Sequence, residues 1–158
     1  DNWLSHECLA YALEVDDVIA VATRHDRPLF IDFTGVNCVN CRTMETSVLN
    51  QPEILDILAT VPRAQLYLDK VPTVKDNQEA DAILKTNLDF CLQKTDAAAM
   101  PTYVILSPDG KTVLSVTSGI VSQEKFRQFL DAGIRSFENS QQDVAELESS
   151  KPSSETVR

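Results

Sequence analysis

Basic residues are scarce in this sequence. Its 158 residues include 14 Lys and Arg against 24 Asp and Glu, so the formal net charge is −10. Nucleic-acid binding depends on clustered basic side chains that contact phosphates, and this deficit argues against it. The sequence also has no run of about 18 apolar residues, the length that a membrane-spanning helix needs. We therefore expect a chain that binds no nucleic acid and does not span a membrane.

Cysteine is sparse as well. The four cysteines are too few for a small domain that is held together by disulfides. Cys38 and Cys41 form a Cys-x-x-Cys pair, whereas Cys8 and Cys91 stand apart. Zinc sites use the same spacing, but a structural zinc normally needs four ligands, a second pair is missing, and neither histidine has ligand spacing. We therefore expect no metal and no cofactor at this pair.

The chain also lacks a start methionine and a signal peptide. We expect Asp1 to be the first residue of a processed or excised piece, so the missing targeting segment says little about location. The apolar share of 43% is typical of a globular protein. We expect one domain over residues 1–137 and a tail over residues 138–158. That tail has five acids, two bases and almost no large apolar residue, which predicts disorder.

Apolar periodicity and turn signals predict strands that alternate with helices. Strands are expected at residues 29–33, 64–68, 102–106 and 112–117, with a further short strand, or the start of a helix, at 8–13. Helices are expected at residues 16–25, 38–58 with an interruption at Pro52, 78–94 and 122–137. This order predicts an α/β fold in which helices flank a mixed central sheet.

Three side-chain positions follow from these patterns. The strand at residues 29–33 is apolar, and we expect it to be central and buried on both faces. In the helix at 78–94, an apolar stripe that includes Leu88, Cys91 and Leu92 should face the core. Cys91 should then be a buried free thiol, with a disulfide to Cys8 as the alternative.

The Cys-x-x-Cys pair lies where a strand passes into a helix. A helix that begins at Cys38 directs unpaired backbone N–H groups and its positive dipole end at that sulfur, which stabilises a thiolate. Cys41 follows one turn later and is within reach to form a disulfide. This layout, with Met100-Pro101 before a later strand, is typical of a thioredoxin-like redox site. The pattern predicts thiol–disulfide exchange with Cys38 as the nucleophile.

Two acidic residues and a proline complete the predicted site. Asp32 is a carboxylate on an apolar strand, where burial should raise its pKa and let it accept a proton from Cys41. Glu45 lies four residues after Cys41 on the same helix face, and it either shares this role or is a solvated residue. We expect a cis bond before Pro101, which would expose the backbone of Met100 to an extended substrate.

The segment Phe30-Ile-Asp-Phe-Thr-Gly-Val-Asn-Cys-Val-Asn-Cys-Arg-Thr-Met-Glu45 resembles the C-terminal thioredoxin-like domain of the DsbD family. These are thiol:disulfide interchange proteins linked to cytochrome c biogenesis. The resemblance extends over residues 28–137 and is specific only in the quoted segment. It implies a thioredoxin-like fold with an extra helix before the cis-proline. It also implies that Cys38 attacks, that Cys41 resolves, and that Asp32 and Glu45 form an acidic pair that tunes them.

The same resemblance implies a function and a location. It implies a protein-disulfide reductase that relays electrons to disulfide-bearing proteins and is reduced by a membrane or upstream dithiol donor. It also implies a periplasmic or other extracytoplasmic location, as a soluble domain of a membrane-anchored protein, although the family's membrane section and N-terminal domain are missing here. Asn37, where many thioredoxins have tryptophan, and Met100 both depart from the family pattern. A non-catalytic binding module with a structural disulfide is the alternative.

Overall fold

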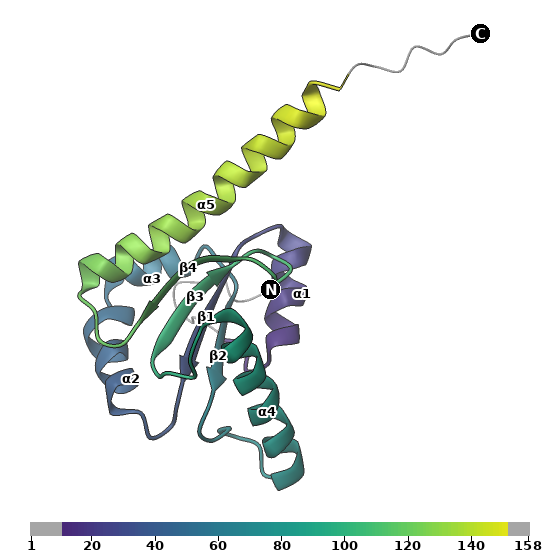
Figure 1. Ribbon diagram of the computed structural model, residues 1–158. Coiled ribbons are helices and arrows are strands. Elements are labelled where there is room, and N and C mark those ends of the chain that lie inside the picture. Colours follow the sequence, from purple (N-terminus) through teal and green to yellow (C-terminus); the bar gives the residue numbers. More distant parts are fainter. Residues whose placement is uncertain (1–10, 152–158) are drawn as a thin grey trace.

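The computed structural model describes residues 11–151, in which helices cover both faces of a central sheet (Figure 1). The strands are β1 (Leu29–Thr34), β2 (Arg63–Tyr67), β3 (Thr102–Leu106) and β4 (Val113–Ser118). The helices are α1 (Val15–His25), α2 (Val39–Met44) with its π-helical continuation η2 (Glu45–Leu49), α3 (Pro52–Leu58), α4 (Asn77–Lys94) and α5 (Gln123–Ser149). No helix in this described part is long and apolar enough to cross a bilayer.

The sheet is mixed, as predicted. Its strand order is β2-β1-β3-β4, with β1 parallel to β2 and antiparallel to β3, and β4 antiparallel to β3. Strand β1 is therefore interior, and all of its residues are buried. This confirms the prediction that the strand leading to the cysteines is central. Of the short strand expected at residues 8–13, residues 8–10 lie outside the described part, and Ala12 forms an isolated parallel bridge with Ala64.

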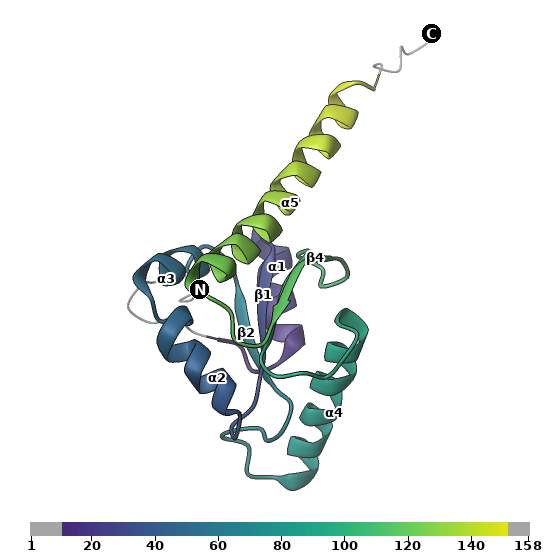
Figure 2. The same ribbon diagram turned by 60° about the vertical axis from the view of Figure 1, so that its left-hand side comes forward.

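Each face of the sheet has its own hydrophobic cluster, because alternate strand residues point to opposite faces. One cluster joins the sheet to α2, η2, α3 and α5, and includes Phe30, Met44, Leu58, Tyr103, Phe126 and Leu130. The other joins the sheet to α1 and α4, and includes Val18, Ala22, Ile31, Phe33, Leu66 and Cys91. In Figure 2, α2 and α4 accordingly lie on opposite sides of the sheet. The cysteine pair belongs to the side that carries α2.

Local signals in the sequence set several element boundaries. Pro52 is at the first turn of α3, where its missing N–H costs nothing, and it separates α3 from η2 as expected. The Ser122 side chain accepts a hydrogen bond from the Lys125 N–H (3.2 Å) and caps α5. Gly110 has a φ of 70° in the turn between β3 and β4, a conformation that glycine adopts without steric cost. The predicted interruption at Pro52 and the predicted helix start at residue 122 are confirmed.

The buried face of α4 differs from the prediction. Leu88 and Leu92 are 38% and 50% exposed, whereas Asn87 and Cys91 are buried. The Asn87 side-chain amide donates a hydrogen bond to the backbone oxygen of Tyr67 at the end of β2 (3.0 Å). This bond turns the helix so that Asn87, and not Leu88, faces the sheet. Cys91 is a free buried thiol, as expected, and Cys8, its alternative partner, lies outside the described residues.

The disordered tail expected from residue 138 is wrong for residues 138–149. They continue α5 to Ser149, so that the helix extends away from the body of the molecule (Figure 1). Residues 138–151 are all exposed. A helix already nucleated by the buried turn at Phe126 and Leu130 can continue without further packing, because adding a residue costs far less than starting a helix. The tail composition predicts the exposure and not the backbone conformation.

Candidate active site

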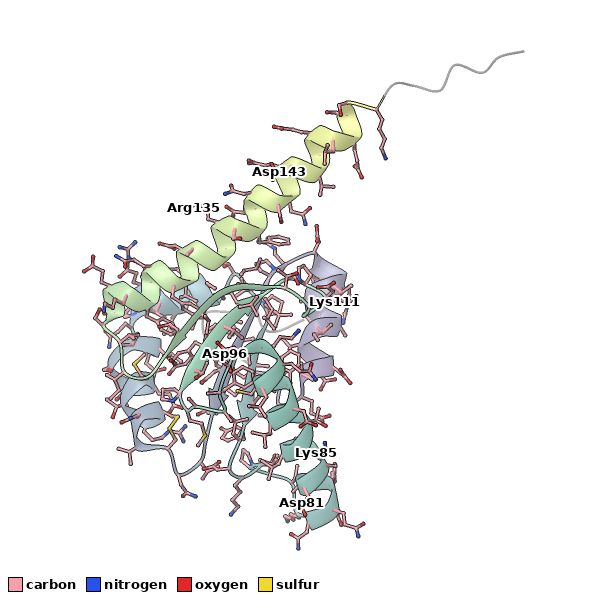
Figure 3. The ribbon with its side chains drawn as sticks, viewed as in Figure 1. Asp81, Lys85, Asp96, Lys111, Arg135 and Asp143 are labelled. Carbon is pink, nitrogen blue, oxygen red and sulfur yellow. A yellow bond between two sulfur atoms is a disulfide. The ribbon has the colours of Figure 1, made fainter. Side chains whose placement is uncertain are left out.

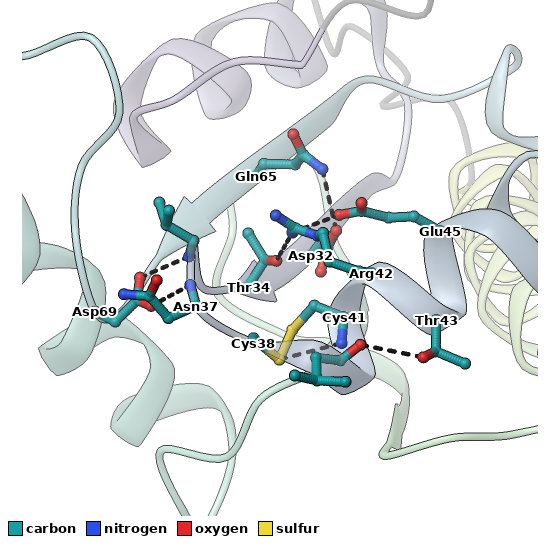
Figure 4. Close-up of a disulfide and its surroundings, with 12 residues drawn as sticks. Asp32, Thr34, Asn37, Cys38, Cys41, Arg42, Thr43, Glu45, Gln65 and Asp69 are labelled. Atoms are coloured by element: carbon teal, nitrogen blue, oxygen red, sulfur yellow. Dashed lines mark hydrogen bonds and ion pairs between the residues drawn. A yellow bond between two sulfur atoms is a disulfide. The ribbon is translucent and has the colours of Figure 1, made fainter.

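The two cysteines of the Cys-x-x-Cys pair form a disulfide between β1 and α2 (Figure 4). The two sulfurs are 2.12 Å apart and the two Cα atoms 5.2 Å apart. Cys38 is the N-cap of α2, and the backbone N–H of Cys41 donates to the Cys38 sulfur over 3.1 Å. A backbone N–H of the helix therefore points at the first sulfur, as predicted. In the reduced state the same N–H would stabilise a thiolate on Cys38.

The two sulfurs differ in access. Cys38 is half-buried at the surface. Cys41 lies on the inner side of the first turn of α2 and is only 1% exposed. The residue that follows Cys38, Val39, is 76% exposed, so the first turn of α2 is open to solvent. An incoming disulfide or thiol can approach Cys38 directly, but it cannot reach Cys41 without moving α2. This arrangement supports Cys38 as the attacking residue.

Asp32 lies on β1 beneath the cysteine pair and is 1% exposed. In the sheet register it is opposite Gln65 on β2 and Tyr103 on β3. The Gln65 amide donates to Asp32 Oδ2 over 3.3 Å, and Oδ1 has no hydrogen-bond partner in the described part of the chain. Burial raises the pKa of Asp32 to about 7, which the Gln65 hydrogen bond opposes. The predicted increase in the pKa of Asp32 is therefore confirmed.

Glu45 lies near Asp32 and is held there by Arg42. The Arg42 guanidinium donates to Glu45 Oε1 over 2.7 Å and to Thr34 Oγ1 over 3.2 Å, which links α2 to the end of β1 (Figure 4). The Glu45 side chain is 27% exposed. After burial and the Gln65 hydrogen bond, the charge of Glu45 contributes to the raised pKa of Asp32, and Arg42 opposes it. The structure therefore brings the two predicted carboxylates together and adds Arg42 to them.

Met100 and Pro101 adjoin the loop that carries the cysteines. The bond between them is cis, as predicted. Thr102 pairs with Phe33, so Pro101 lies at the edge of the sheet where β1 ends. A Cβ atom added to Gly35 would be 2.7 Å from the Met100 sulfur. Residues 35–38, here called the redox loop, therefore pass directly beside Met100, and glycine at the first position leaves room for this contact.

Asp69, in the loop after β2, was not predicted. Its carboxylate accepts hydrogen bonds from the backbone N–H groups of Val36 (2.8 Å) and Asn37 (2.9 Å) in the redox loop (Figure 4). Burial raises the pKa of Asp69 and these backbone donors lower it, with a net result below its ordinary value. The Cβ position of Gly35 that faces Met100 also faces this carboxylate, at 2.8 Å from Asp69 Oδ2. Asp69 therefore holds the backbone that precedes Cys38.

The pKa of each of the three tyrosines of the chain is affected by the charge of Asp32, which the sequence also did not indicate. Burial raises the pKa of Tyr11, Tyr67 and Tyr103, and the negative charge of Asp32 contributes to each increase. These tyrosines come from the segment before α1, from β2 and from β3. At neutral pH all three phenols are therefore protonated and uncharged.

We expect Asp69→Ala to loosen the redox loop. The loss of two hydrogen bonds to Val36 and Asn37 should lower the free energy of unfolding by about 1 kcal/mol, because the site is exposed. Amide hydrogen exchange at both residues should become faster. Asp96→Ala, at an exposed aspartate in the loop after α4, is the control and should change neither quantity (Figure 3). Unchanged exchange at Val36 and Asn37 would contradict a positioning role for Asp69.

Comparisons with known proteins agree with this geometry. The profile of a thioredoxin-like domain family matches residues 15–134. A DsbH oxidoreductase structure is similar with 16% identity and a TM-score of 0.58, covering 80% of this chain and 88% of that chain. The oxidised DsbD C-terminal domain of Neisseria meningitidis is similar with 21% identity and a TM-score of 0.53, covering 77% and 97%. A comparison with curated proteins found no match. The fold is therefore thioredoxin-like.

Proposed function

Because the chain belongs to the thioredoxin-like domain family, we propose that it is a thiol:disulfide oxidoreductase that acts as a protein-disulfide reductase. The observation that supports this proposal most directly is the asymmetry of the disulfide. The accessible Cys38 sulfur lies at the start of α2, and the buried Cys41 sulfur is bonded to it. Reversible dithiol–disulfide chemistry needs one sulfur that meets the partner and a second that releases it.

The proposed reaction has two exchange steps. In the reduced protein the Cys38 thiolate attacks one sulfur of a partner disulfide, so a mixed disulfide forms and the partner's second sulfur leaves as a thiolate. Cys41 then loses its proton and attacks the Cys38 sulfur. The Cys38–Cys41 bond forms again, the mixed disulfide breaks, and the partner leaves as a dithiol with two more electrons. The protein is oxidised in this cycle, and a second dithiol must reduce it.

Asp32 and Glu45 are the proposed proton-handling pair. A carboxyl group with a pKa of about 7 can take a proton from Cys41 and return it near neutral pH. Arg42 holds Glu45 against α2, and the charge of Glu45 helps to keep the pKa of Asp32 high. We propose Cys38, Cys41, Asp32 and Glu45 as the catalytic residues.

Partners and location are further parts of the proposal. We propose that Met100 and Pro101 contact the partner, because they adjoin the redox loop at Gly35. The partners are disulfide-bearing proteins, and the electron donor is a membrane or upstream dithiol. The resemblance of residues 30–45 to the DsbD family supports a periplasmic or other extracytoplasmic location. The likeness to the DsbD C-terminal domain is consistent with it and by itself concerns the fold alone.

The reduction potential tests the direction of electron flow. Two carboxylates beside the cysteines disfavour thiolates, so they destabilise the reduced pair relative to the disulfide. We therefore expect a potential closer to the thioredoxin value of about −270 mV than to the DsbA value of about −120 mV. Equilibration with glutathione buffers in a Cys91→Ala background measures it. A value near the oxidising end would contradict a reductase, and a bond that resists mild reductant would favour the structural-disulfide alternative.

A further inference from the structure

A groove beside the redox loop has no part in the chemistry described above. Its volume is about 390 Å³, and it is lined by Val36 and by residues 70–75 of the loop between β2 and α4. Val36, Val71, Pro72 and Val74 supply apolar surface. Val36 is 38% exposed, so part of this surface is open to solvent. A neighbouring polypeptide could therefore place an apolar side chain there.

The groove has a fixed position relative to the reactive sulfur. Val36 is two residues before Cys38, and its backbone N–H is bound by Asp69, which belongs to the same loop as the opposite wall. Thr73, in that wall, has a φ of 73°, a conformation that a β-branched residue seldom adopts. Strained backbone of this kind is common at ligand-binding sites. The groove therefore adjoins the loop that leads to Cys38.

The charged side chains that line the groove, Lys70 and Lys75, are both cationic. Both lysines are exposed, and neither forms an ion pair within residues 11–151. The adjacent carboxylates do not line the groove, and each accepts hydrogen bonds from backbone N–H groups. Asp69 accepts from the redox loop, and Asp76 caps α4 by accepting from the Glu79 N–H over 2.8 Å. On a chain with a net charge of −10, two unpaired ammonium groups in a groove that includes Val36 favour a negatively charged partner segment.

We propose that this groove selects partners whose reactive cysteine lies in an extended acidic segment. The apolar side chain next to the partner cysteine enters the groove, and the acidic side chains beyond it pair with Lys70 and Lys75. This inference rests on the proposed function, because it concerns the partner that reacts with Cys38. It adds a specificity determinant that takes no part in bond making or proton transfer.

Chromogenic peptides test the proposal. Three five-residue peptides have a central cysteine flanked by leucines and end in aspartate, asparagine or lysine on both sides. Each cysteine forms a mixed disulfide with thionitrobenzoate, which is released as a coloured thiolate when the reduced protein attacks. Rates are corrected with the Cys38→Ala variant. We expect the aspartate peptide to react about tenfold faster than the lysine peptide at low salt, with a smaller ratio at high salt.

Charge-reversal variants locate the effect. Lys70→Glu with Lys75→Glu should invert the preference, with rates normalised to the asparagine peptide so that changes in Cys38 reactivity cancel. Lys125→Glu with Lys151→Glu gives the same net charge away from the groove and should preserve the preference. Equal low-salt rates for the three peptides, or an equal effect of the two double variants, would contradict the proposal that the groove selects acidic partner segments. Absence of thionitrobenzoate release from every peptide would instead overturn the proposed function.

Discussion

Cys38→Ala should reduce the rate of protein-disulfide reduction to that of the reductant alone. Cys38 has the accessible sulfur of the pair, and Cys41 beneath it is 1% exposed. Alanine removes the nucleophile and leaves no sulfur that an incoming disulfide can reach at this position. The reduction of insulin disulfides by dithiothreitol, followed as turbidity with and without the protein, measures the effect. The wild type should accelerate this reaction, and the variant should not.

Cys41→Ser separates attack from release. Cys38 can still form a mixed disulfide, but the sulfur that resolves it is absent, so a covalent adduct with the partner should accumulate. Mass spectrometry under non-reducing conditions detects this adduct. Cys91→Ala is the control, because this buried thiol lies on the opposite face of the sheet and should not affect turnover. Full activity of Cys38→Ala, or no adduct with Cys41→Ser, would contradict the assigned roles.

Asp32→Asn should stabilise the oxidised protein at pH 8 by about 4 kcal/mol. Burial raises the pKa of Asp32 from 3.8 to about 7, so the native state retains a proton that the unfolded state releases. This contribution to stability is fully present below about pH 4 and is lost as the pH rises to about 7. The difference between the two pKa values corresponds to about 4 kcal/mol. Asparagine does not ionise, so the variant should lack this pH dependence.

Urea unfolding at pH 4, 6 and 8 measures this prediction. Wild type and Asp32→Asn should have similar stability at pH 4 and diverge at higher pH. Asp81→Asn, an exposed residue of α4, should match the wild type throughout (Figure 3). The stabilised variant should nevertheless exchange disulfides about a hundredfold more slowly, because it cannot accept a proton from Cys41. If Asp32→Asn is no more stable than the wild type at pH 8, Asp32 is not the buried acid inferred here.

The features predicted best from the sequence are those with local causes. The start of α2 at Cys38, the break at Pro52 and the cap at Ser122 depend on residues within a few positions of one another. The central position of β1 follows from its apolar residues, because only a strand covered on both faces tolerates them. The same strand also predicts a buried carboxylate, because Asp32 is a charged residue between apolar ones.

The features that were missed depend on contacts between distant segments. Asp69 is one of two acidic residues in a polar loop, and only the fold places it against residues 36–37. Gln65 becomes a partner of Asp32 only through the register of β1 with β2. The face of α4 is set by the hydrogen bond of Asn87 to the end of β2, which periodicity cannot reveal. Proximity along the chain carries no information about these contacts.

The unequal burial of the two sulfurs has a kinetic consequence. Under the proposed function, the molecule that delivers electrons and the molecule that receives them both react at Cys38, because Cys41 is buried on the inner side of α2. The two cannot occupy the protein simultaneously, so turnover is a ping-pong cycle without a ternary complex. At high concentration, either reactant would then inhibit turnover, because it competes with the other reactant for the same docking face. A protein of this kind carries electrons between two molecules that it binds one after the other, and it never holds both at once.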